Sequence, residues 1–550
     1  RLQFKQTGTG TASALTIGAD TSGKDNHYTS VSLIAEDVVT DSPTLNYAVM
    51  NPIDGPTFST AFGNLRVNGS SSSAGTIGST FFPTTGKWYV EMVAEDMGNG
   101  MSVGIKSDTE GTFWKPTRGT SVIYQSDGNK IIDGGSATSY GATYTVGDII
   151  SLKINLDDGE IEFLKNNASQ GNASTSLTSG VAFGVFFLDT SSSNNARSQF
   201  NFGQDSSFHN TVTSGSANAS DANGHGDFYY SVPSGYLALN SANLPETTIT
   251  PLNDDLPEDY FNTRLYQGNG TAIGSGGQAV TGVGFQPDWV WIKNRDAADD
   301  HAVYDVVRGV TKQIETNPDA PEVETTESEG LTAFGADGFT VGSSAQVNTN
   351  TEDFVSWNWI AGGSASSNSA GDITSSVSAN TKPGFSIVGY TGDSSSATRT
   401  IGCGLTKKPE MVILKNRTED SVSDSWFVWH TAFGTASPSK YMTLFNNDDV
   451  ASSGVFVDSS FSDNSGNALF AVNGGYNGVN KSGTTYIAYC FNSIEGYSKM
   501  GSYTGNGSND GTFVFLGFRP SWIMTKRSNS TSDWIIQDNK RQTFNPSDAW

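Results

Sequence analysis

One phrase occurs three times in the second half of the chain and constrains its architecture more than any other feature. Each copy has a polar, Gly-rich approach, a proline, a short apolar stretch and closing basic residues, and the copies occupy residues 284–295, 405–417 and 517–527. The prolines Pro287, Pro409 and Pro520 lie roughly 110 to 120 residues apart. Solenoid repeats are only ~20–50 residues long. The phrase therefore predicts a row of similar β-domains.

Other marks recur at the same interval. Each repeat begins at a Tyr-x-Gly-Asn or Tyr-x-Gly-Asp turn, at Tyr266, Tyr390 and Tyr503. Repeat one ends in the strand-like stretches 338–341 and 354–359, and repeat two in 454–457 and 486–491. The third repeat reaches Trp550 about halfway through this template, so we expect the natural chain to continue for at least ~50 residues. The opening at Arg1 likewise indicates a piece of a longer polypeptide.

Short alternations of apolar and polar residues recur along the whole chain, bounded by Gly, Asn, Asp and Ser. A period of two is typical of half-buried antiparallel strands. Asp157, Asp158 and Gly159 separate two such runs, which predicts a β-hairpin. The predicted fold class is all-β, with tandem antiparallel β-sandwich domains joined by linkers rich in Gly, Ser and Asn.

Composition shifts give the expected domain boundaries. We expect seven segments: the end of an upstream lectin-like β-sandwich with a linker (1–45), a β-sandwich (46–212), a linker (213–260), β-repeat module 1 (261–363), a linker (364–383), β-repeat module 2 (384–497) and a partial β-repeat module 3 (498–550).

Charge and cysteine content narrow the class of partner. The net charge of −25 would repel a phosphate backbone, which argues against nucleic acid. Carboxylates cluster at 254–255 and 299–300 without an EF-hand ligand spacing, so no cofactor is predicted and Ca²⁺ binding stays open. No apolar run approaches ~18 residues, so membrane insertion is not expected. Cys403 and Cys490 are predicted to be buried free thiols.

A search for catalytic groups favours a protein without enzyme activity. The five histidines lie outside metal-ligand spacing: His27, His209, His225, His301 and His430. The Gly-rich stretch 268–274 has no phosphate-loop Lys and is interpreted as a turn. The carboxylate pairs Glu91/Glu95 and Asp157/Asp158 could serve glycoside hydrolysis, but a hairpin turn is sufficient explanation for the second pair.

The aromatic residues are the candidate ligand contacts. Trp289 and Trp291 are spaced i and i+2, as are Trp357 and Trp359, so each pair lines one face of its strand. The alternatives are packing between sheets or protomers and a platform on which sugar rings stack. Trp114 and Tyr124, in loops expected within 46–212, are the further candidates.

The first complete domain resembles a known family. Its stretches 86–91, 103–105, 147–152, 155–163 and 200–203 follow the order of a SPRY/B30.2 domain: a strand, Val-Gly-Ile, Gly-Asp before a hairpin, and a late aromatic strand. The resemblance implies a two-sheet β-sandwich that binds partners through loops at one end and has no enzyme chemistry of its own.

The repeats resemble a module of tailed-bacteriophage virion proteins, especially those of marine phages. The stretches that carry the likeness are 305–312, 383–392, 483–491 and 496–506. The resemblance implies an extracellular position on the virion, at the tail or capsid surface. We therefore expect a tail-fibre segment or receptor-binding adhesin, a homotrimer that contacts other virion proteins and host surface polysaccharide or an outer-membrane protein. The alternatives are a capsid decoration or head-fibre protein and a bacterial surface adhesin or filament protein.

Overall fold

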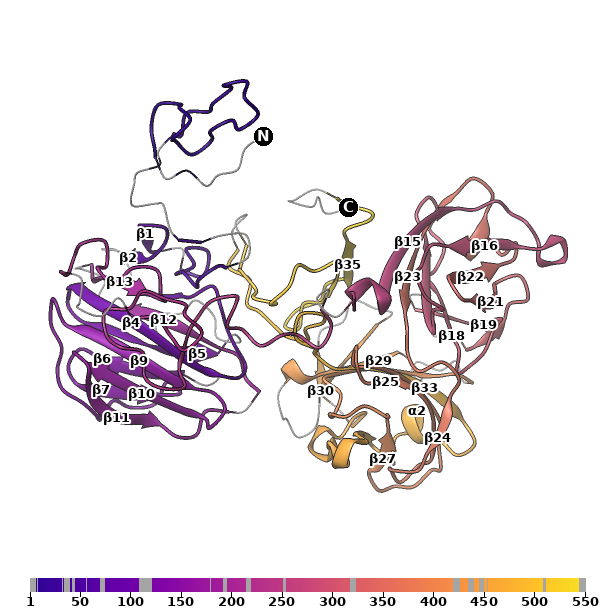
Figure 1. Ribbon diagram of the computed structural model, residues 1–550. Helices are drawn as coiled ribbons and strands as arrows, with labels where there is room; N and C mark the ends of the chain where they lie inside the picture. The colour runs from indigo at the N-terminus through magenta and orange to yellow at the C-terminus, as the bar shows by residue number, and fades with distance from the viewer. Residues whose placement is uncertain are drawn as a thin grey trace. The chain divides into compact units, whose positions relative to one another are not determined.

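The structure is a computed structural model, and its parts are described separately. It describes residues 6, 8–31, 33, 40–41, 45–55, 57–69, 75–107, 121–178, 180–190, 195–213, 219–250, 254–316, 323–418, 426–433, 440–444, 450–452, 454–507 and 511–543. The chain divides into two compact units (Figure 1). Unit 1 comprises residues 1–246 and 502–517, and unit 2 comprises residues 247–501 and 518–550.

Unit 1 contains two antiparallel sheets. The first has the order β1-β2-β13-β4-β9-β10-β11, with β14 on β4, and the second has the order β3-β12-β5-β6-β7-β8. The strands are β1 (Ser59–Ala61), β2 (Arg66–Asn68), β3 (Gly75–Gly78), β4 (Lys87–Asp96), β5 (Met101–Ser107), β6 (Ser121–Gln125), β7 (Asn129–Ile132), β8 (Thr138–Ser139), β9 (Ile149–Asn155), β10 (Glu160–Lys165), β11 (Ala168–Ser174), β12 (Phe183–Asp189), β13 (Arg197–Asn201) and β14 (Leu237–Ala238).

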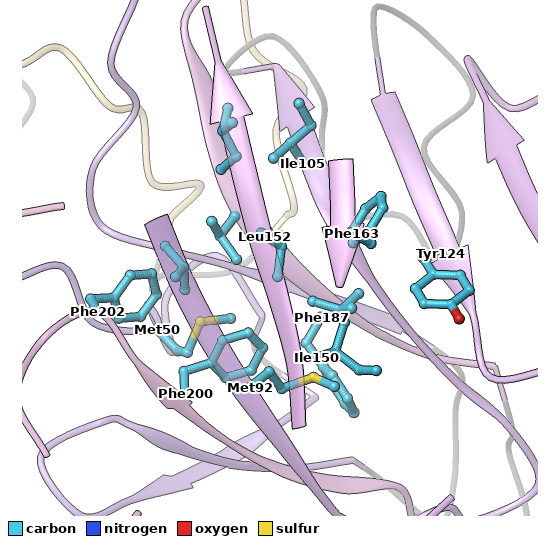
Figure 2. Close-up of a cluster of buried hydrophobic side chains, with 14 of the residues drawn as sticks. Met50, Met92, Ile105, Tyr124, Ile150, Leu152, Phe163, Phe187, Phe200 and Phe202 are labelled. Carbon is cyan, nitrogen blue, oxygen red and sulfur yellow. The ribbon is translucent and has the colours of Figure 1, made fainter. Parts of the chain in front are cut away.

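One hydrophobic core joins these two sheets (Figure 2). Met92, Leu152 and Phe200 enter it from the first sheet, and Ile105 and Phe187 enter it from the second. All are buried, with exposed fractions of 2% or less. Side chains from two inner faces that meet in a single core define a β-sandwich.

The predicted hairpin at 157–159 is confirmed. Asn155 of β9 pairs with Glu160 of β10, so the turn spans residues 156–159. Gly159 has φ 72°, a backbone conformation that glycine adopts most easily. Asp157 accepts a hydrogen bond from the Gly86 N–H at 2.7 Å, and Asp158 lies 3.0 Å from Lys87 Nζ. The turn therefore also fixes the start of β4.

Much of the segment 213–260, which the sequence predicts as a linker, packs on the sandwich of unit 1. β14 runs parallel to β4, and Phe228 is fully buried beside Tyr47 and Tyr89. Asp221 accepts hydrogen bonds from the N–H groups of Ala238 and His225. The polar residues that suggested a linker form turns whose hydrogen bonds hold this segment in place.

Unit 2 begins with repeat 1 (residues 261–363). A six-stranded sheet of order β15-β23-β17-β18-β19-β20 is accompanied by a smaller sheet of order β16-β22-β21. The elements are η3 (Pro257–Asp259), β15 (Phe261–Gln267), η4 (Ile273–Ser275), β16 (Gln278–Thr281), β17 (Trp289–Asn294), β18 (Ala302–Asp305), β19 (Lys312–Glu315), β20 (Thr325–Thr326), β21 (Leu331–Gly335), β22 (Gly338–Val341), α1 (Ala345–Asn348) and β23 (Asp353–Trp359).

Repeat 2 (residues 364–497) has the same plan. Its large sheet has the order β24-β25-β26-β33-β28-β29-β30-β31, and β27 pairs with β32. The elements are β24 (Ser366–Asn368), β25 (Ser375–Asn380), β26 (Phe385–Thr391), β27 (Arg399–Gly402), β28 (Met411–Asn416), β29 (Phe427–His430), η6 (Thr431–Phe433), β30 (Lys440–Thr443), β31 (Ala451–Ser452), η7 (Asp458–Ser460), η8 (Asn464–Gly466), β32 (Leu469–Val472), α2 (Asn477–Asn480) and β33 (Thr485–Phe491).

Two boundaries in repeat 2 differ from the sequence-based expectation. Residues 364–383 supply β24 and β25, because Val377 and small serine side chains pack on the neighbouring strand. The strand equivalent to β22 is β32, and the stretch 454–457 forms only a single bridge between Phe456 and Val472. The Gly-x-x-Val similarity of 454–457 to 338–341 is therefore not a structural equivalence.

The repeated turns share one local device. Tyr266 stacks on Phe354 with ring centroids 5.2 Å apart, and Tyr390 stacks on Tyr486 at 4.9 Å. Each first tyrosine also donates a hydrogen bond of 2.8 Å to a carbonyl oxygen, that of Val347 in repeat 1 and its counterpart in repeat 2. The Tyr-x-Gly signature thus marks where β15 is fastened to β23 and where β26 is fastened to β33, the last strand of each repeat.

Repeat 3 (residues 498–550) contributes a two-stranded sheet of β34 (Trp522–Thr525) and β35 (Ile535–Asp538). Figure 1 draws β35 in yellow, near the C-terminus. The predicted all-β fold class is confirmed, because the described helices are single turns and the described sheets are antiparallel apart from the β14–β4 contact. Of residues 1–45, the described part includes one bridge, between Gly8 and Thr16.

In unit 2, repeats 1 and 2 and the residues of repeat 3 that belong to this unit (498–501 and 518–550) share an aromatic core and two kinds of polar contact. In the first kind, a turn aspartate accepts a hydrogen bond from an aromatic side chain of another repeat. Tyr489 donates to Asp305 at 2.8 Å, and Trp357 donates to Asp538 at 3.1 Å. Asp305 and Asp538 are each also paired with an arginine three residues later.

In the second kind, an indole N–H donates to a strand carbonyl of the neighbouring repeat. Trp426 donates to the carbonyl oxygen of Glu315 at 2.7 Å, and Trp534 donates to that of Thr443 at 2.9 Å. Together the two kinds of contact link repeat 1 with repeat 2, repeat 2 with repeat 3, and repeat 3 with repeat 1.

The buried ion pair of repeat 1 whose aspartate also accepts the Tyr489 hydroxyl of repeat 2 yields a stability prediction. The Arg308 side chain is fully buried and contacts Asp305 and, at 3.6 Å, Glu324. The substitution Asp305→Ala removes the carboxylate that pairs with the buried Arg308 guanidinium and accepts the hydrogen bond of the Tyr489 hydroxyl. We expect a loss of about 3 kcal/mol in the free energy of unfolding. Urea unfolding followed by tryptophan fluorescence measures this loss. The signal reports mainly on the repeats, because only Trp88 and Trp114 precede residue 256.

Arg295→Ala is the matched control. Arg295 lies 3.8 Å from Asp353, and both side chains are partly exposed. Exposed pairs contribute under about 1 kcal/mol. Equal urea midpoints for the Asp305→Ala and Arg295→Ala proteins would contradict a structural role for the buried pair.

Candidate functional site

The four tryptophans proposed as ligand contacts come together in the core of unit 2. β17 and β23 pair in a register that sets Trp289 opposite Trp359 and Trp291 opposite Trp357. Their exposed fractions are 2%, 6%, 2% and 0%, respectively. Trp289 stacks on Tyr489 of repeat 2 with ring centroids 4.4 Å apart, and Trp359 meets Trp522 of repeat 3 at 5.5 Å.

These positions correct the expectation of a sugar-stacking platform at Trp289, Trp291, Trp357 and Trp359. Each ring is covered by aromatic or aliphatic side chains of the same or another repeat, so no face is presented to a ligand. The structure realises the other interpretation of the i, i+2 spacing, which is packing between sheets. The sequence carried no sign of which interpretation holds, because covering residues such as Tyr489 against Trp289 and Trp522 against Trp359 lie more than a hundred positions away.

Tyr124 lies on β6 rather than in a loop, and it is fully buried. Its ring packs against Tyr140, Tyr144 and Phe163 with centroid separations of 5.2 to 5.3 Å. Its hydroxyl donates a short hydrogen bond to the Ala142 carbonyl oxygen. Burial raises the pKa of Tyr124 to about 12. Tyr124 therefore belongs to the core and offers no ligand contact there. Trp114 lies outside the described residues.

Glu91 is a buried carboxylic acid of the sandwich whose pKa is raised. It points from β4 toward the segment after residue 219, is fully buried, and accepts 2.8 Å hydrogen bonds from the N–H groups of Tyr229 and Tyr230. Tyr89 and Asn201 also donate to it. Burial raises the pKa of Glu91 to about 7 against the lowering effect of these donors. The carboxyl group thus fastens this segment to β4.

Glu95, the other member of the Glu91/Glu95 pair considered for glycoside hydrolysis, has a different role. Glu95 lies between Arg66, at 2.7 Å, and Arg197, at 2.6 Å. Burial opposes ionisation of Glu95, but hydrogen bonds from Gln199 and Arg197 and the charge of Arg66 outweigh it and lower its pKa. Both carboxylates are therefore engaged in holding strands together. Among the described residues, no group of three or more His, Cys, Asp or Glu side chains could hold a metal ion.

A polar groove lies at the edge of repeat 2. It has a volume of about 600 Å³ and is lined by residues between Gly362 and Ala370, by Val377 and Ala379 of β25, and by Gly404, Gly466 and Asn467. Asn368 and Asn467 exchange side-chain hydrogen bonds of 2.8 and 3.3 Å within it. Every one of these lining residues is uncharged. Sequence reasoning missed this groove because residues 364–383 were expected to be a linker.

The described residues contain no helix long and apolar enough to cross a membrane. Together, the sandwich of unit 1, the repeated sheets of unit 2 and the uncharged groove define a multidomain all-β protein.

The comparisons with known proteins agree with this organisation. Residues 86–205 match the family described as SPRY domain, and residues 256–550, more than half of the chain, match the family described as Domain of unknown function (DUF7483). The chain belongs to the DUF7483 family, and its residues 86–205 form a SPRY domain.

Solved SPRY structures are similar to part of unit 1. The SPRY domain of human HERC1 is 16% identical, with 28% of this chain and 96% of that chain covered and a TM-score of 0.25. A human SPRY domain structure is 18% identical, with 26% and 94% covered and a TM-score of 0.21. The TRIM65 PSpry domain is 11% identical, with 28% and 90% covered and a TM-score of 0.24.

The pKa of Glu91 predicts a pH dependence of stability. In the unfolded chain a glutamate titrates near 4.5, whereas Glu91 in the folded chain titrates near 7. The folded state therefore binds the extra proton between these values, and stability falls as the pH rises through this window. We expect the unfolding free energy of the native chain relative to Glu91→Gln to fall by up to about 3 kcal/mol between pH 5 and pH 8. Calorimetric unfolding at stepped pH measures it.

Glu246→Gln, at an exposed carboxyl, is the control for general charge effects. A difference between native and Glu91→Gln chains that stayed constant from pH 5 to pH 8 would contradict the assigned proton.

Proposed function

We propose that this chain is a non-enzymatic binding protein of a tailed-phage virion, a tail-fibre segment or adhesin that contacts a glycan or protein on the host surface. The observation that carries the proposal is the uncharged groove beside β24. Its hydroxyl, amide and backbone groups occur on a chain with a net charge of −25. Such groups match the hydroxyls of a neutral sugar and make no demand for a charged ligand.

The shape of the groove suits weak, repeated binding. A polar site of this kind gives modest affinity for one sugar unit, and several copies on one particle multiply it through avidity. Deep, apolar pockets are the usual sites for small molecules and cofactors, and the groove differs from them in having serine and asparagine at its walls.

The SPRY domain supports a binding role from the other unit. SPRY domains are two-sheet sandwiches that serve as interaction modules. The proposed position on a virion rests on a different argument, the resemblance of the repeats to phage structural modules. The homotrimer expected for a fibre stays a prediction.

Filling the groove tests the proposal. Ser366 lines it, and its replacement Ser366→Trp would occupy it with an indole. We expect binding of the labelled chain to susceptible host cells to fall at least about tenfold, the loss of roughly 1.4 kcal/mol of contacts. The assay is saturable binding to susceptible and resistant cells.

Ser376→Trp is the matched control, because Ser376 lies on the adjacent strand, is exposed and is outside the groove. Equal binding by both variants would remove the groove from the proposal. Absence of cell binding by the native chain, with attachment to empty virions instead, would favour the capsid-associated alternative.

A further inference from the structure

The two cysteines of the chain come together inside repeat 2. Cys403 and Cys490 are free thiols, as the sequence predicts, and both are fully buried. They belong to the same hydrophobic core, which also receives side chains from the large sheet and from the β27–β32 pair. The strands that carry the two residues show why the thiols meet within this core.

Strand pairing places Cys490 in a row of residues that crosses the large sheet. Ala379 of β25 pairs with Ser386 of β26, and Ser386 pairs with Cys490 of β33. Residues that lie directly opposite each other share one face of a sheet. On that face, Val388 and Ala488 lie two positions from the row and belong to the core of repeat 2. The Cys490 side chain therefore points toward the β27–β32 pair.

Cys403 lies over the same row from the opposite side of the core. It follows β27 directly, and the Ala468 carbonyl oxygen accepts hydrogen bonds from its N–H at 2.9 Å and from its Sγ at 3.1 Å. The next residue, Gly404, has φ 73°, and a Cβ at this position would lie 2.9 Å from the Cβ of Ala379. Glycine permits this close approach. The backbone beside Cys403 therefore lies against the row that contains Cys490.

The two thiols are hydrogen-bonded to each other. This hydrogen bond lowers the pKa of Cys403, whereas burial raises the pKa of Cys490. Because the Cys403 thiol donates to the Ala468 carbonyl oxygen, the Cys490 thiol is the donor to the Cys403 sulfur. The thiolate is the reactive form of cysteine, so Cys403 is the nucleophile of the pair and Cys490 is the thiol in contact with it.

We propose that Cys403 and Cys490 are an oxidation site, at which hydrogen peroxide converts the two thiols to a disulfide bond. The Cys403 thiolate attacks one oxygen of the peroxide, the O–O bond breaks, and hydroxide leaves, which forms a sulfenic acid. The Cys490 sulfur attacks the sulfenic sulfur, the S–O bond breaks, and the second oxygen leaves as water. The thiols lose two electrons and two protons in total, and the peroxide is reduced to two molecules of water.

The groove at the edge of repeat 2 gives a small oxidant a route to the pair. Gly404, Val377 and Ala379 are among its lining residues, and its volume is about 600 Å³. Gly404 is bonded to Cys403, so the wall of the groove lies next to the first thiol to react. A larger oxidant such as oxidised glutathione must place its own sulfur against a buried thiol, which requires opening of the core.

The disulfide would tie the two layers of repeat 2 together. Cys490 lies on β33, between β26 and β28 of the large sheet, and Cys403 belongs to the segment that pairs beside β32. A cross-link between residues far apart in the chain restricts the unfolded state and so stabilises the folded state. Oxidation would therefore strengthen repeat 2 without a change in its strand pairing.

Peptide mapping of the full chain tests the proposal. The folded native chain is incubated with hydrogen peroxide, remaining thiols are blocked with iodoacetamide, and the digest is analysed by mass spectrometry without reductant. We expect a cross-linked pair of peptides that contain residues 403 and 490, and recovery of both thiols after treatment with dithiothreitol. Oxidised glutathione at the same concentration should form the cross-link at least about tenfold more slowly, because access limits the exchange.

Cys490→Ala is the matched variant. It keeps the attacking thiol, so peroxide should leave a sulfenic acid at Cys403 that dimedone traps, whereas the native chain should proceed to the disulfide. The thermal unfolding midpoint of the native chain should rise by at least about 5 °C on oxidation, and that of Cys490→Ala should not. The peptide map needs only the native chain. Absence of the 403–490 cross-link, its formation only in urea, or disulfide-linked dimers in its place would overturn the proposal.

Discussion

Burial of the paired aromatic residues on β23 and β33, the last strands of repeats 1 and 2, is the interaction on which unit 2 depends. Trp357 and Trp359 on β23, and Tyr489 and Phe491 on β33, project from one face of their strands into a single core. Aromatic side chains bury about 150–250 Å² each, so this layer supplies much of the apolar area between the repeats. Because β23 and β33 each also pair with two neighbouring strands, the same residues set the register of each sheet and the contact between sheets.

Buried polar atoms decide which aromatic side chain can occupy position 357 on β23 and position 489 on β33. Tyrosine and tryptophan each carry a donor that needs an acceptor when buried, and Asp305 and Asp538 provide it. Each aspartate is balanced by an arginine three residues later. A charged turn is therefore compatible with an aromatic core, since the donors of one repeat and the acceptors of another satisfy each other. This explains why a strongly acidic chain keeps ion pairs in its interior.

The sequence predicted local structure well and long-range packing poorly. Alternation, the turn at Gly159 and the repeated phrase depend on neighbours in the chain, so the all-β class, the hairpin and the repeats could be predicted. The burial of Trp289 could not, because it depends on Tyr489, two hundred positions away. The groove was missed for a related reason: serine-rich stretches form linkers or edge strands, and only pairing with β25 shows that β24 is a strand.

The contacts among the repeats bear on how such a chain can assemble. The aspartate of repeat 1 accepts a hydrogen bond from repeat 2, and the aspartate of repeat 3 accepts one from repeat 1. Indole N–H groups of repeats 2 and 3 donate to carbonyl oxygens of the preceding repeat. These contacts all run in one direction around the three repeats, as contacts between subunits do in a cyclic trimer. One chain therefore covers the aromatic faces that would otherwise require partner subunits.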